Sequence, residues 1–399
     1  MYASLYELFD AWFGIKFGPL KVLHTFGLMM AISFLVAAWI LSKELRRKED
    51  QGLLKPTPAH TWVGRRSSTM ELIEAFSLAF ILFYKLVYIV LNFNEFKTDP
   101  QGTLVSFKGN ILGGIIAGVL YALLTYRDKE SKKLSDPKME TMLMYPHHLV
   151  GNITLIAAIG GIIGAKLFDA LENFNDFIHD PAMIFSSSGL TVYGGLIVGA
   201  ISVLVYAKSK GIPLLHLVDA AAPAMILAYA VGRIGCQIAG DGDWGIPNPH
   251  PMPGIISFLP NWMWSFGYPH NVEHAGIPIP GCVGEYCTVM IPGVYPTPFY
   301  ETIMGTIIFF ILWSMRKKIH EPGVLFCWYL VFNGIERFMI ELIRVNIKYN
   351  IFGIHPTQAQ IIAPIFFLLG VSGIYYFKNK AKKDAQKATE TQKDLQGSN

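Results

Sequence analysis

Charged residues are scarce in this chain of 399 residues. Asp, Glu, Lys and Arg make up 16% of it, whereas hydrophobic residues make up 52%. A soluble fold of this length would lack the polar side chains needed to cover its surface. The scarcity of charge therefore excludes an ordinary soluble protein. The formal net charge of +4 is small, and it gives no reason to expect a nucleic-acid partner.

Several motifs that carry chemistry are also missing. The chain has no Gly-x-Ser-x-Gly elbow, no His-Glu-x-x-His pair and no phosphate-binding loop, which argues against a serine hydrolase, a zinc protease and a nucleotide-driven pump. Asp241-Gly-Asp243 resembles the start of a calcium loop but lacks the ligands that should follow. His270 and His274 have ligand spacing without a third ligand. We therefore expect no metal and no cofactor.

Long hydrophobic runs are what the chain does have. They come in blocks of about 20 residues, the length of helix that crosses about 30 Å of hydrocarbon. We predict an all-α polytopic membrane bundle of about nine spans, with a large loop rich in Gly and Pro at residues 240–296. The predicted spans are residues 22–42, 70–92, 107–126, 149–171, 189–207, 214–238, 297–315, 324–344 and 356–377.

The two ends of the chain differ from the spans. Leu5, Leu8, Phe9 and Trp12 recur at helical spacing, which is typical of a short helix in the membrane interface, although a frayed terminus fits as well. Residues 378–399 are polar and rich in Lys, Gln, Thr and Ser. Such a segment buries too little apolar surface to fold alone, and we predict a disordered cytoplasmic tail.

Basic residues fall in alternate connections between the predicted spans. No Lys or Arg occurs from Ala239 to Val294. Because Lys and Arg in short loops stay in the cytoplasm, the amino terminus should lie outside and the carboxyl terminus inside. Cys282 and Cys287 then share the outer loop, where they could form a disulfide or remain free thiols.

Ionisable side chains inside the spans are candidates for function, because they are costly in a bilayer. At 1.5 Å per residue, Arg233 lies roughly 8 Å and Arg337 about 10 Å below the outer surface. Tyr193, Glu301 and His24 enter from the same side. This layer contains lipid phosphates, and guanidinium groups bind phosphate well. We therefore expect a lipid phosphate site there.

Arg337 also has a plain structural interpretation. A stripe at helical spacing holds Asn333, Arg337, Glu341 and Arg344, which could neutralise one another as structure. Arg233 has no acidic residue within a turn on its own helix, so a functional role is favoured more strongly there. Tyr193-Gly194-Gly195 leaves backbone open either for helix packing or for a substrate chain.

Residues 232–245 read Gly-Arg-Ile-Gly-Cys-Gln-Ile-Ala-Gly-Asp-Gly-Asp-Trp-Gly. This segment resembles the signature of the prolipoprotein diacylglyceryl transferases, which commonly reads Gly-Arg-Ile/Leu-Gly-Asn, then Asn-Gly-Glu and Trp-Gly. Further segments agree in order along the chain: His24–Gly27, Gly160–Phe168, Tyr193–Leu196, Tyr295–Glu301, Glu336–Arg344 and Gln358–Gln360.

The resemblance implies transfer of the diacylglyceryl group of phosphatidylglycerol to the lipobox cysteine of a prolipoprotein in the bacterial inner membrane, with release of glycerol 1-phosphate. It implies catalytic roles for Arg233, Arg337, Tyr193, Asp241, Asp243 and Glu301, and substrate contacts from Arg233, His24, Gly194, Gly195, Gly240, Glu341 and Arg344. Arg233 would bind the phosphate, and Arg337 would help to neutralise it as it departs.

This chain departs from the family pattern at several positions. Tyr193 stands where a histidine is usual, so the general base is open: the phenol could serve, or it could only hold the lipid. Tyr295 replaces a second histidine, and Cys236 replaces an asparagine. Asp241-Gly-Asp243 is one residue longer than its counterpart, and either acid could replace the family glutamate.

The family usually has seven spans, so residues 44–146 look like an insertion with two extra spans. We predict residues 1–43 as the interfacial segment and first span, 147–377 as the catalytic core, and 378–399 as the tail. A small-solute or lipid transporter of the inner membrane is the alternative function, since Lys85 and the intramembrane Arg and Glu residues would also suit a translocation path. A membrane scaffold is a third interpretation.

Overall fold

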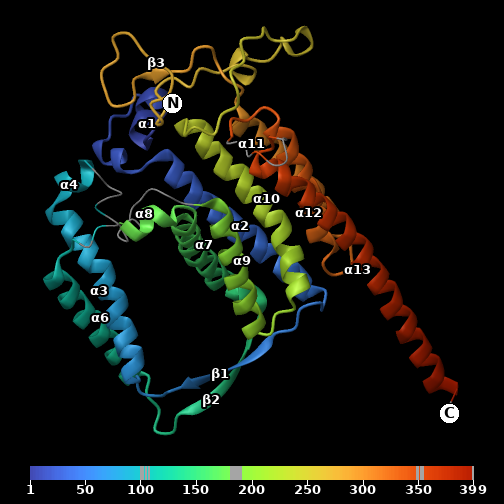
Figure 1. The fold of residues 1–399 in the computed structure, drawn as a ribbon. Coiled ribbons are helices and arrows are strands. Elements are labelled where there is room, and N and C mark those ends of the chain that lie inside the picture. The colour runs from blue at the N-terminus through green and yellow to red at the C-terminus, as the bar shows by residue number, and fades with distance from the viewer. Residues whose placement is uncertain are drawn as a thin grey trace. The chain divides into compact units, whose positions relative to one another are not determined.

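A computed structural model describes residues 1–98, 103, 106, 108–179, 191–346, 350 and 355–397 (Figure 1). Residue 107, residues 189–190 and residues 398–399, which belong to predicted spans or to the tail, lie outside the described residues. The chain forms two compact units, each considered by itself. Unit 1 comprises Met1–Leu54 and Ile212–Asn399, and unit 2 comprises Lys55–Gly211.

Helices dominate the described residues of both units, and a long helix overlaps each predicted span. Unit 1 contains α1 (Leu5–Phe13), α2 (Thr25–Asp50), α10 (Leu214–Ala239), α11 (Thr297–Met315), α12 (Val324–Glu341), α13 (Gln358–Gly397), the short 3-10 helices η1 (Gly18–Val22), η4 (Gly254–Ile256) and η5 (Asn261–Met263), and strands β3 (Ile277–Pro278) and β4 (Thr288–Val289). Unit 2 contains β1 (Thr57–Val63), α3 (Thr69–Leu91), α4 (Phe93–Thr98), α6 (Ile111–Ser131), β2 (Lys138–Met144), η2 (Pro146–Leu149), α7 (Val150–Glu172), α8 (Phe174–His179) and α9 (Val192–Ser209).

Within the described residues, eight helices are long and apolar enough to cross a bilayer, namely α2, α3, α6, α7, α9, α10, α11 and α13. The prediction of a polytopic helical membrane protein is confirmed. The predicted span at 324–344 corresponds to α12, which has 18 residues and ends at Glu341. α12 is not one of the eight candidate helices because it carries three charged residues, Glu336, Arg337 and Glu341.

Small residues bring the helices of unit 1 together. α10 packs on α2 and α11, and α12 packs on α13. A Cβ added at Gly334 of α12 would lie 2.7 Å from the carbonyl oxygen of Ala363, and one at Gly235 of α10 would lie 2.9 Å from the Cβ of Met29. Such contacts allow close backbone approach, which is how helices associate in lipid.

Unit 2 consists of two helix pairs and a β-ribbon. α7 packs on α9, and α3 packs on α6. β1 and β2 pair antiparallel from Thr57 opposite Met144 to Val63 opposite Lys138. This unit runs to Gly211, so its bounds differ from those of the predicted insertion at 44–146, and α2 continues to Asp50. The proposed division into an insertion and a core stays a prediction.

Segment 240–296 of unit 1 is ordered around a small core of Trp244, Tyr268 and Val294. β3 and β4 pair antiparallel, with Ile277 opposite Val289. Cys282 and Cys287 form a disulfide, which resolves the two alternatives left open by the sequence. The segment is therefore a folded cap on one end of α10 rather than a loose loop.

The chain just before the amino-terminal helix α1 contacts this cap, because the Met1 amino group donates to the Pro269 carbonyl. The next residue, Tyr2, donates its amide to the Ile238 carbonyl of α10 at 2.9 Å. Ser4 and Glu7 form a capping box at its start, and Gly14 ends it with φ +67°. Trp12 and Phe13 are exposed. An ordered amphipathic helix with exposed aromatic side chains fits a position in the membrane interface better than a frayed terminus.

The tail differs from the expectation of disorder. α13 continues from Gln358 to Gly397 without a break, through the segment predicted to begin a tail at residue 378. The residues after Tyr376 are mainly Lys, Ala, Gln, Glu and Asp. Lys, Ala, Gln and Glu are strong helix formers, so local propensity can extend the helix beyond its apolar part.

Charged side chains link the helix ends on the side of unit 1 away from segment 240–296. Glu44 of α2 is fully buried, and it accepts from Arg47 at 2.9 Å and from Arg316, just after α11, at 3.1 Å. Asp219 of α10 accepts the amides of Gly323 at 2.8 Å and Phe326 at 2.9 Å. We call Glu44 and Asp219, together with their partners Arg47, Lys48 and Arg316, the Glu44 network.

Candidate active site

Three arginine side chains meet at the other end of unit 1, around one carboxylate. Glu301 of α11 has no exposed side-chain surface, and its oxygens lie 3.2 Å from Arg233 Nε, 3.1 Å from Arg344 Nη1 and 3.4 Å from Arg337 Nη1. Arg233 comes from α10 and Arg337 from α12. We call this group, together with Asp243 and Glu341, the arginine cluster.

Asp243 reaches the cluster from the loop after α10. Its two oxygens accept hydrogen bonds from different guanidinium groups, Arg233 Nη1 and Arg344 Nη2. Burial alone would raise the pKa of the Asp243 carboxyl, but Arg233 and Arg344 outweigh it and hold that pKa below its usual value. Asp243 is therefore ionised and bridges two cations in this structure.

The backbone around Asp243 is fixed by tertiary hydrogen bonds. Thr297 Oγ1 donates to the Asp243 carbonyl at 2.6 Å, and the Gly245 amide donates to the Tyr295 carbonyl at 2.8 Å. Gly240 and Gly242 have φ values of +66° and +86°, a backbone conformation that favours glycine. The turn thus brings the carboxylate of a loop residue to the end of α10.

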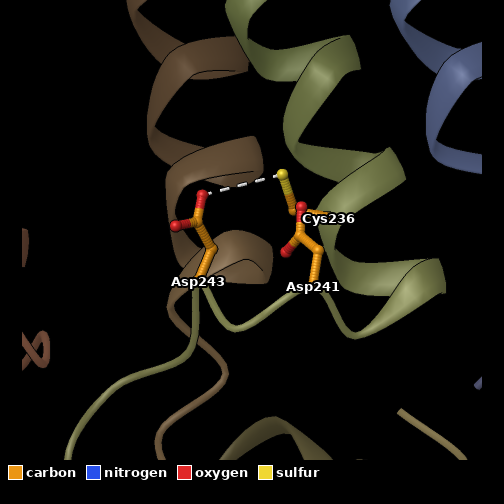
Figure 2. A group of neighbouring side chains, drawn as sticks. All are labelled: Cys236, Asp241 and Asp243. Atoms are coloured by element: carbon orange, nitrogen blue, oxygen red, sulfur yellow. Dashed lines mark hydrogen bonds between the residues drawn. The ribbon is translucent and has the colours of Figure 1, made fainter. Parts of the chain in front are cut away.

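Asp241 lies next to Cys236 and Asp243, in the turn that follows α10 (Figure 2). The Cys236 thiol donates to Asp243 Oδ2 at 3.8 Å. One oxygen of Asp241 is buried and has no hydrogen-bond partner among the described residues. Burial, and then the neighbouring Asp243 charge, raise the pKa of the Asp241 carboxyl.

These three side chains could in principle hold a cation. Their donor atoms lie within 4.8 Å of one another. However, both oxygens of Asp243 already bind guanidinium groups, so a metal ion would face two arginine charges at close range. We assign no metal to this group.

Two residues of the site were not assigned from the sequence. Tyr229 Oη lies 2.9 Å from Glu301 Oε1 and 3.1 Å from Glu336 Oε1, and the Arg233 guanidinium lies 5.1 Å from the Tyr229 ring centroid. A phenol has one proton to donate, so a hydrogen bond to both carboxylates requires one of them to be protonated. The sequence did hold one sign of this role: Tyr229 precedes Arg233 by one helical turn, so the two side chains share a face of α10.

The structure confirms some of the expected neighbours and leaves others apart. Arg337 pairs with Glu341 at 3.2 Å along α12, as the structural interpretation of the stripe expected. Arg344 instead follows the end of the helix and pairs with Asp243 and Glu301. His24 precedes α2 and pairs through its backbone with Ser4. Among the described residues, no hydrogen bond or ion pair joins the His24 side chain to the cluster.

Tyr193, Gly194 and Gly195 belong to α9 in unit 2. A Cβ added at Gly194 would lie 2.4 Å from the Gly164 carbonyl oxygen of α7, and one at Gly195 would lie 3.0 Å from that of Gly161. Both glycines thus serve close packing of α9 on α7. Their expected contact with substrate, and the convergence of Tyr193 with the arginines, stay predictions.

The arginine cluster has the chemistry of an anion site. Its guanidinium groups remain charged in a low dielectric and can each present paired donors to phosphate or carboxylate oxygens. Segment 240–296, which caps this end of the bundle, carries no Lys or Arg of its own. The positive charge around Glu301 is therefore supplied by the three arginines.

Comparison with known proteins gives a match to the family model described as prolipoprotein diacylglyceryl transferase over residues 134–376, more than half of the chain. This chain belongs to the prolipoprotein diacylglyceryl transferase family. The matched range contains the whole arginine cluster and Tyr193, and His24 lies outside it.

Curated relatives carry the same name, phosphatidylglycerol--prolipoprotein diacylglyceryl transferase. The relative from Clostridium tetani is 28% identical over 248 residues, which cover 62% of this chain and 85% of the relative. That from Dehalococcoides mccartyi is 27% identical over 298 residues, covering 74% and 99%. That from Leptospira interrogans is 26% identical over 220 residues, covering 49% and 61%. Membership of the transferase family is thus consistent along most of the chain.

Proposed function

We propose that this chain transfers the sn-1,2-diacylglyceryl group of phosphatidylglycerol to the lipobox cysteine of prolipoproteins and releases glycerol 1-phosphate. The observation that carries the proposal is the meeting of Arg233, Arg337 and Arg344 around buried Glu301 at one end of a membrane bundle. A lipid phosphate lies at that level of a bilayer, so the cluster suits a phospholipid headgroup better than a solute from the water phase.

The three arginines take different roles in this proposal. Arg233 and Arg344 bind the phosphate, and Arg337 helps to neutralise the phosphate as charge builds on it during departure. Fixed donors of this kind contribute several kcal/mol when they are aimed at developing charge, about 2.7–4 kcal/mol for one donor. Glu301 holds the three guanidinium groups in place, and Glu341 positions Arg337.

The other residues that the family resemblance implicates are proposed to contact the substrates. Tyr193 holds the lipid headgroup, in place of the histidine that is usual in the family. His24, Gly194, Gly195 and Gly240 are proposed to contact the lipid chains or the lipobox segment of the signal peptide.

The nucleophile belongs to the acceptor peptide and not to this chain. A free thiol has a pKa near 8.5, so the site must favour its thiolate. The positive charge of the arginines stabilises the thiolate. A nearby carboxylate is also needed to accept the thiol proton. Asp241 and Asp243 both lie at the cluster, and one of them is proposed to replace the glutamate of the family signature.

We place the protein in the bacterial inner membrane, with the arginine cluster toward the outer leaflet, the amino terminus outside and the carboxyl terminus inside. The positive-inside rule supports this orientation. Within unit 1, the basic residues Lys43, Arg46, Arg47 and Arg316 lie at the ends of α2 and α11 that are remote from segment 240–296. With α12 counted as a crossing, nine spans put the two termini on opposite sides.

A transporter is less well supported. A translocation path needs polar groups at mid-membrane and toward both faces. Lys85, which suggested such a path, instead donates to the carbonyl oxygens of Thr103 at 2.9 Å and Lys108 at 2.8 Å. It therefore has a local role in holding the connection between α3 and α6.

The test is transfer by the purified full-length chain in nanodiscs that contain phosphatidylglycerol labelled in its diacylglyceryl group, with a lipobox peptide as acceptor. We expect a labelled thioether with wild type and none with Arg233→Ala. Lys132→Ala removes an exposed cation that pairs with Asp128 of α6 in unit 2, and it should transfer like wild type. Absence of thioether from folded wild type would contradict the proposal. Tyr193→Phe should weaken lipid binding while leaving the pH dependence of transfer unchanged.

A further inference from the structure

One carboxylate of the arginine cluster differs from the others in its exposure. The side chain of Asp243 is 31% exposed, whereas those of Glu301 and Glu341 are 0% exposed. Asp243 also comes from a loop, whereas the other two project from helices. It is therefore the acid of the cluster that can leave without opening the helix bundle.

The position of Asp243 resembles that of a bound phosphate diester. A phosphate diester carries one negative charge and two free oxygens, and each of these can accept from a guanidinium group. The Asp243 carboxylate satisfies the same donors, with one oxygen on Arg233 and the other on Arg344. A phosphate bound between these two arginines would therefore have to take the place of Asp243.

The structure allows this exchange by a change of one side chain. The Asp243 backbone is held by Thr297, and the following residues are held by Tyr295 and Ile343. Glu301 stays within 3.4 Å of all three arginines, so the guanidinium groups remain paired after Asp243 leaves. Rotation of a partly exposed side chain is fast, on the scale of about ps to ns.

The displaced carboxylate would meet a thiol. In the present structure the Cys236 sulfur donates to Asp243 Oδ2 at 3.8 Å (Figure 2), which shows that a thiol fits beside this oxygen. Cys236 itself is buried in α10. The incoming lipobox thiol can make the same kind of contact from the exposed side of Asp243.

We propose that Asp243 occupies the phosphate position until the lipid displaces it from Arg233 and Arg344, and that the displaced carboxylate then accepts the proton of the acceptor thiol. This inference rests on the proposed function and deepens it by naming the general base. It also makes thiol activation depend on a bound lipid phosphate.

The proposed transfer moves one proton and exchanges a carbon–oxygen bond for a sulfur–carbon bond. The thiol loses its proton to Asp243, and the thiolate attacks the glycerol carbon that bears the phosphate. The sulfur–carbon bond forms, the carbon–oxygen bond breaks, and its electron pair leaves with the phosphate oxygen of glycerol phosphate. Asp243 then returns the proton to the phosphate monoester, whose second pKa is near 6, and rebinds the arginines.

Electrostatics supports the same order of events. While Arg233 and Arg344 hold Asp243, they keep the pKa of its carboxyl low. A phosphate that takes over both guanidinium groups removes this effect and adds a second anion nearby, and burial also favours the protonated form. The carboxylate therefore becomes a stronger base when the lipid is bound.

The experiment uses the full-length protein and a short-chain phosphatidylglycerol as the binding probe. Asp243→Asn removes the competing charge, so the probe should bind about tenfold more tightly. Single-turnover thioether formation should fall about 100-fold, the usual contribution of a general base, and should recover as pH rises through the thiol pKa. Glu273→Gln changes an exposed acid of segment 240–296, and neither quantity should change.

Asp243→Glu covers the case in which the Asn variant does not fold, because it keeps the charge. It should bind the probe like wild type and transfer about tenfold more slowly, since its carboxylate is displaced by a methylene. Weaker probe binding by Asp243→Asn would contradict the proposal that Asp243 occupies the phosphate position. A wild-type transfer rate in either variant would contradict its role as the general base. Wild type without thioether product would instead contradict the proposed function.

Discussion

Unit 1 has a network of buried charges at each end, and the two networks use their charges differently. In the Glu44 network, Glu44 is fully buried between two arginines, and Asp219 accepts two backbone amides at the start of α12. In the arginine cluster, one acid is 31% exposed and comes from a loop.

Because Asp219 binds backbone amides, its partners cannot leave without unwinding a helix. The Asp243 carboxylate accepts from the side chains of Arg233 and Arg344, so an anion of matching shape can replace it. Buried ion pairs are poor evidence for stability in general, and here the nature of the partner separates a structural network from one suited to substrate binding.

The largest effect on transfer is expected from Glu301→Gln, with Glu44→Gln as the matched change in the other network. Each change leaves arginines beside a neutral amide, and breaking a buried pair costs about 3–5 kcal/mol. Glu301→Gln should also reduce transfer by a further factor of about 100 per folded molecule, because the guanidinium groups lose their orientation. Thermal unfolding and transfer are measured on the same samples. Equal losses of transfer in both variants, after correction for folded fraction, would remove the distinction between the networks.

A smaller effect is expected from Asp219→Ala. This change removes the acceptor for the amides of Gly323 and Phe326, a capping interaction worth about 0.5–2 kcal/mol. The unfolding temperature should fall, while the affinity for short-chain phosphatidylglycerol stays unchanged. A change in lipid affinity would show that the two ends of unit 1 are coupled.

The smallest effect is a pH-dependent one at Asp241. Burial raises the pKa of this carboxyl above its unfolded value, so wild type loses stability as pH rises from about 4 through the folded pKa. Asp241→Asn does not ionise. Its unfolding temperature should match that of wild type near pH 4 and exceed it slightly at pH 8. A lower unfolding temperature than wild type at pH 8 would show that the ionised carboxylate stabilises the fold.

The spans were predictable because a bilayer demands about 20 apolar residues per helix, a pattern that survives without tertiary information. The gathering of Arg233, Arg337 and Glu301 was predictable for a related reason. Once the spans have directions, residues at equal depth share a layer. The pairing of Arg337 with Glu341 followed from helical spacing.

Other features depended on tertiary geometry that the sequence does not display. Arg344 leaves the stripe because α12 ends at Glu341, and helix ends are hard to place. Asp243 reaches two arginines only through the turn at Gly240 and Gly242. Tyr229 contacts Glu336 across two helices. The placement of Tyr193 relative to the cluster stays a prediction.

The three charges on α12 also bear on how the protein is made. A charged residue costs up to about 2.5–3.5 kcal/mol when a helix enters the bilayer alone, and the full cost applies at the helix centre. Glu336 and Arg337 of α12 find partners on α10 and α11, which precede α12 in the chain. Insertion of α12 is therefore less costly when α10 and α11 are already in the membrane.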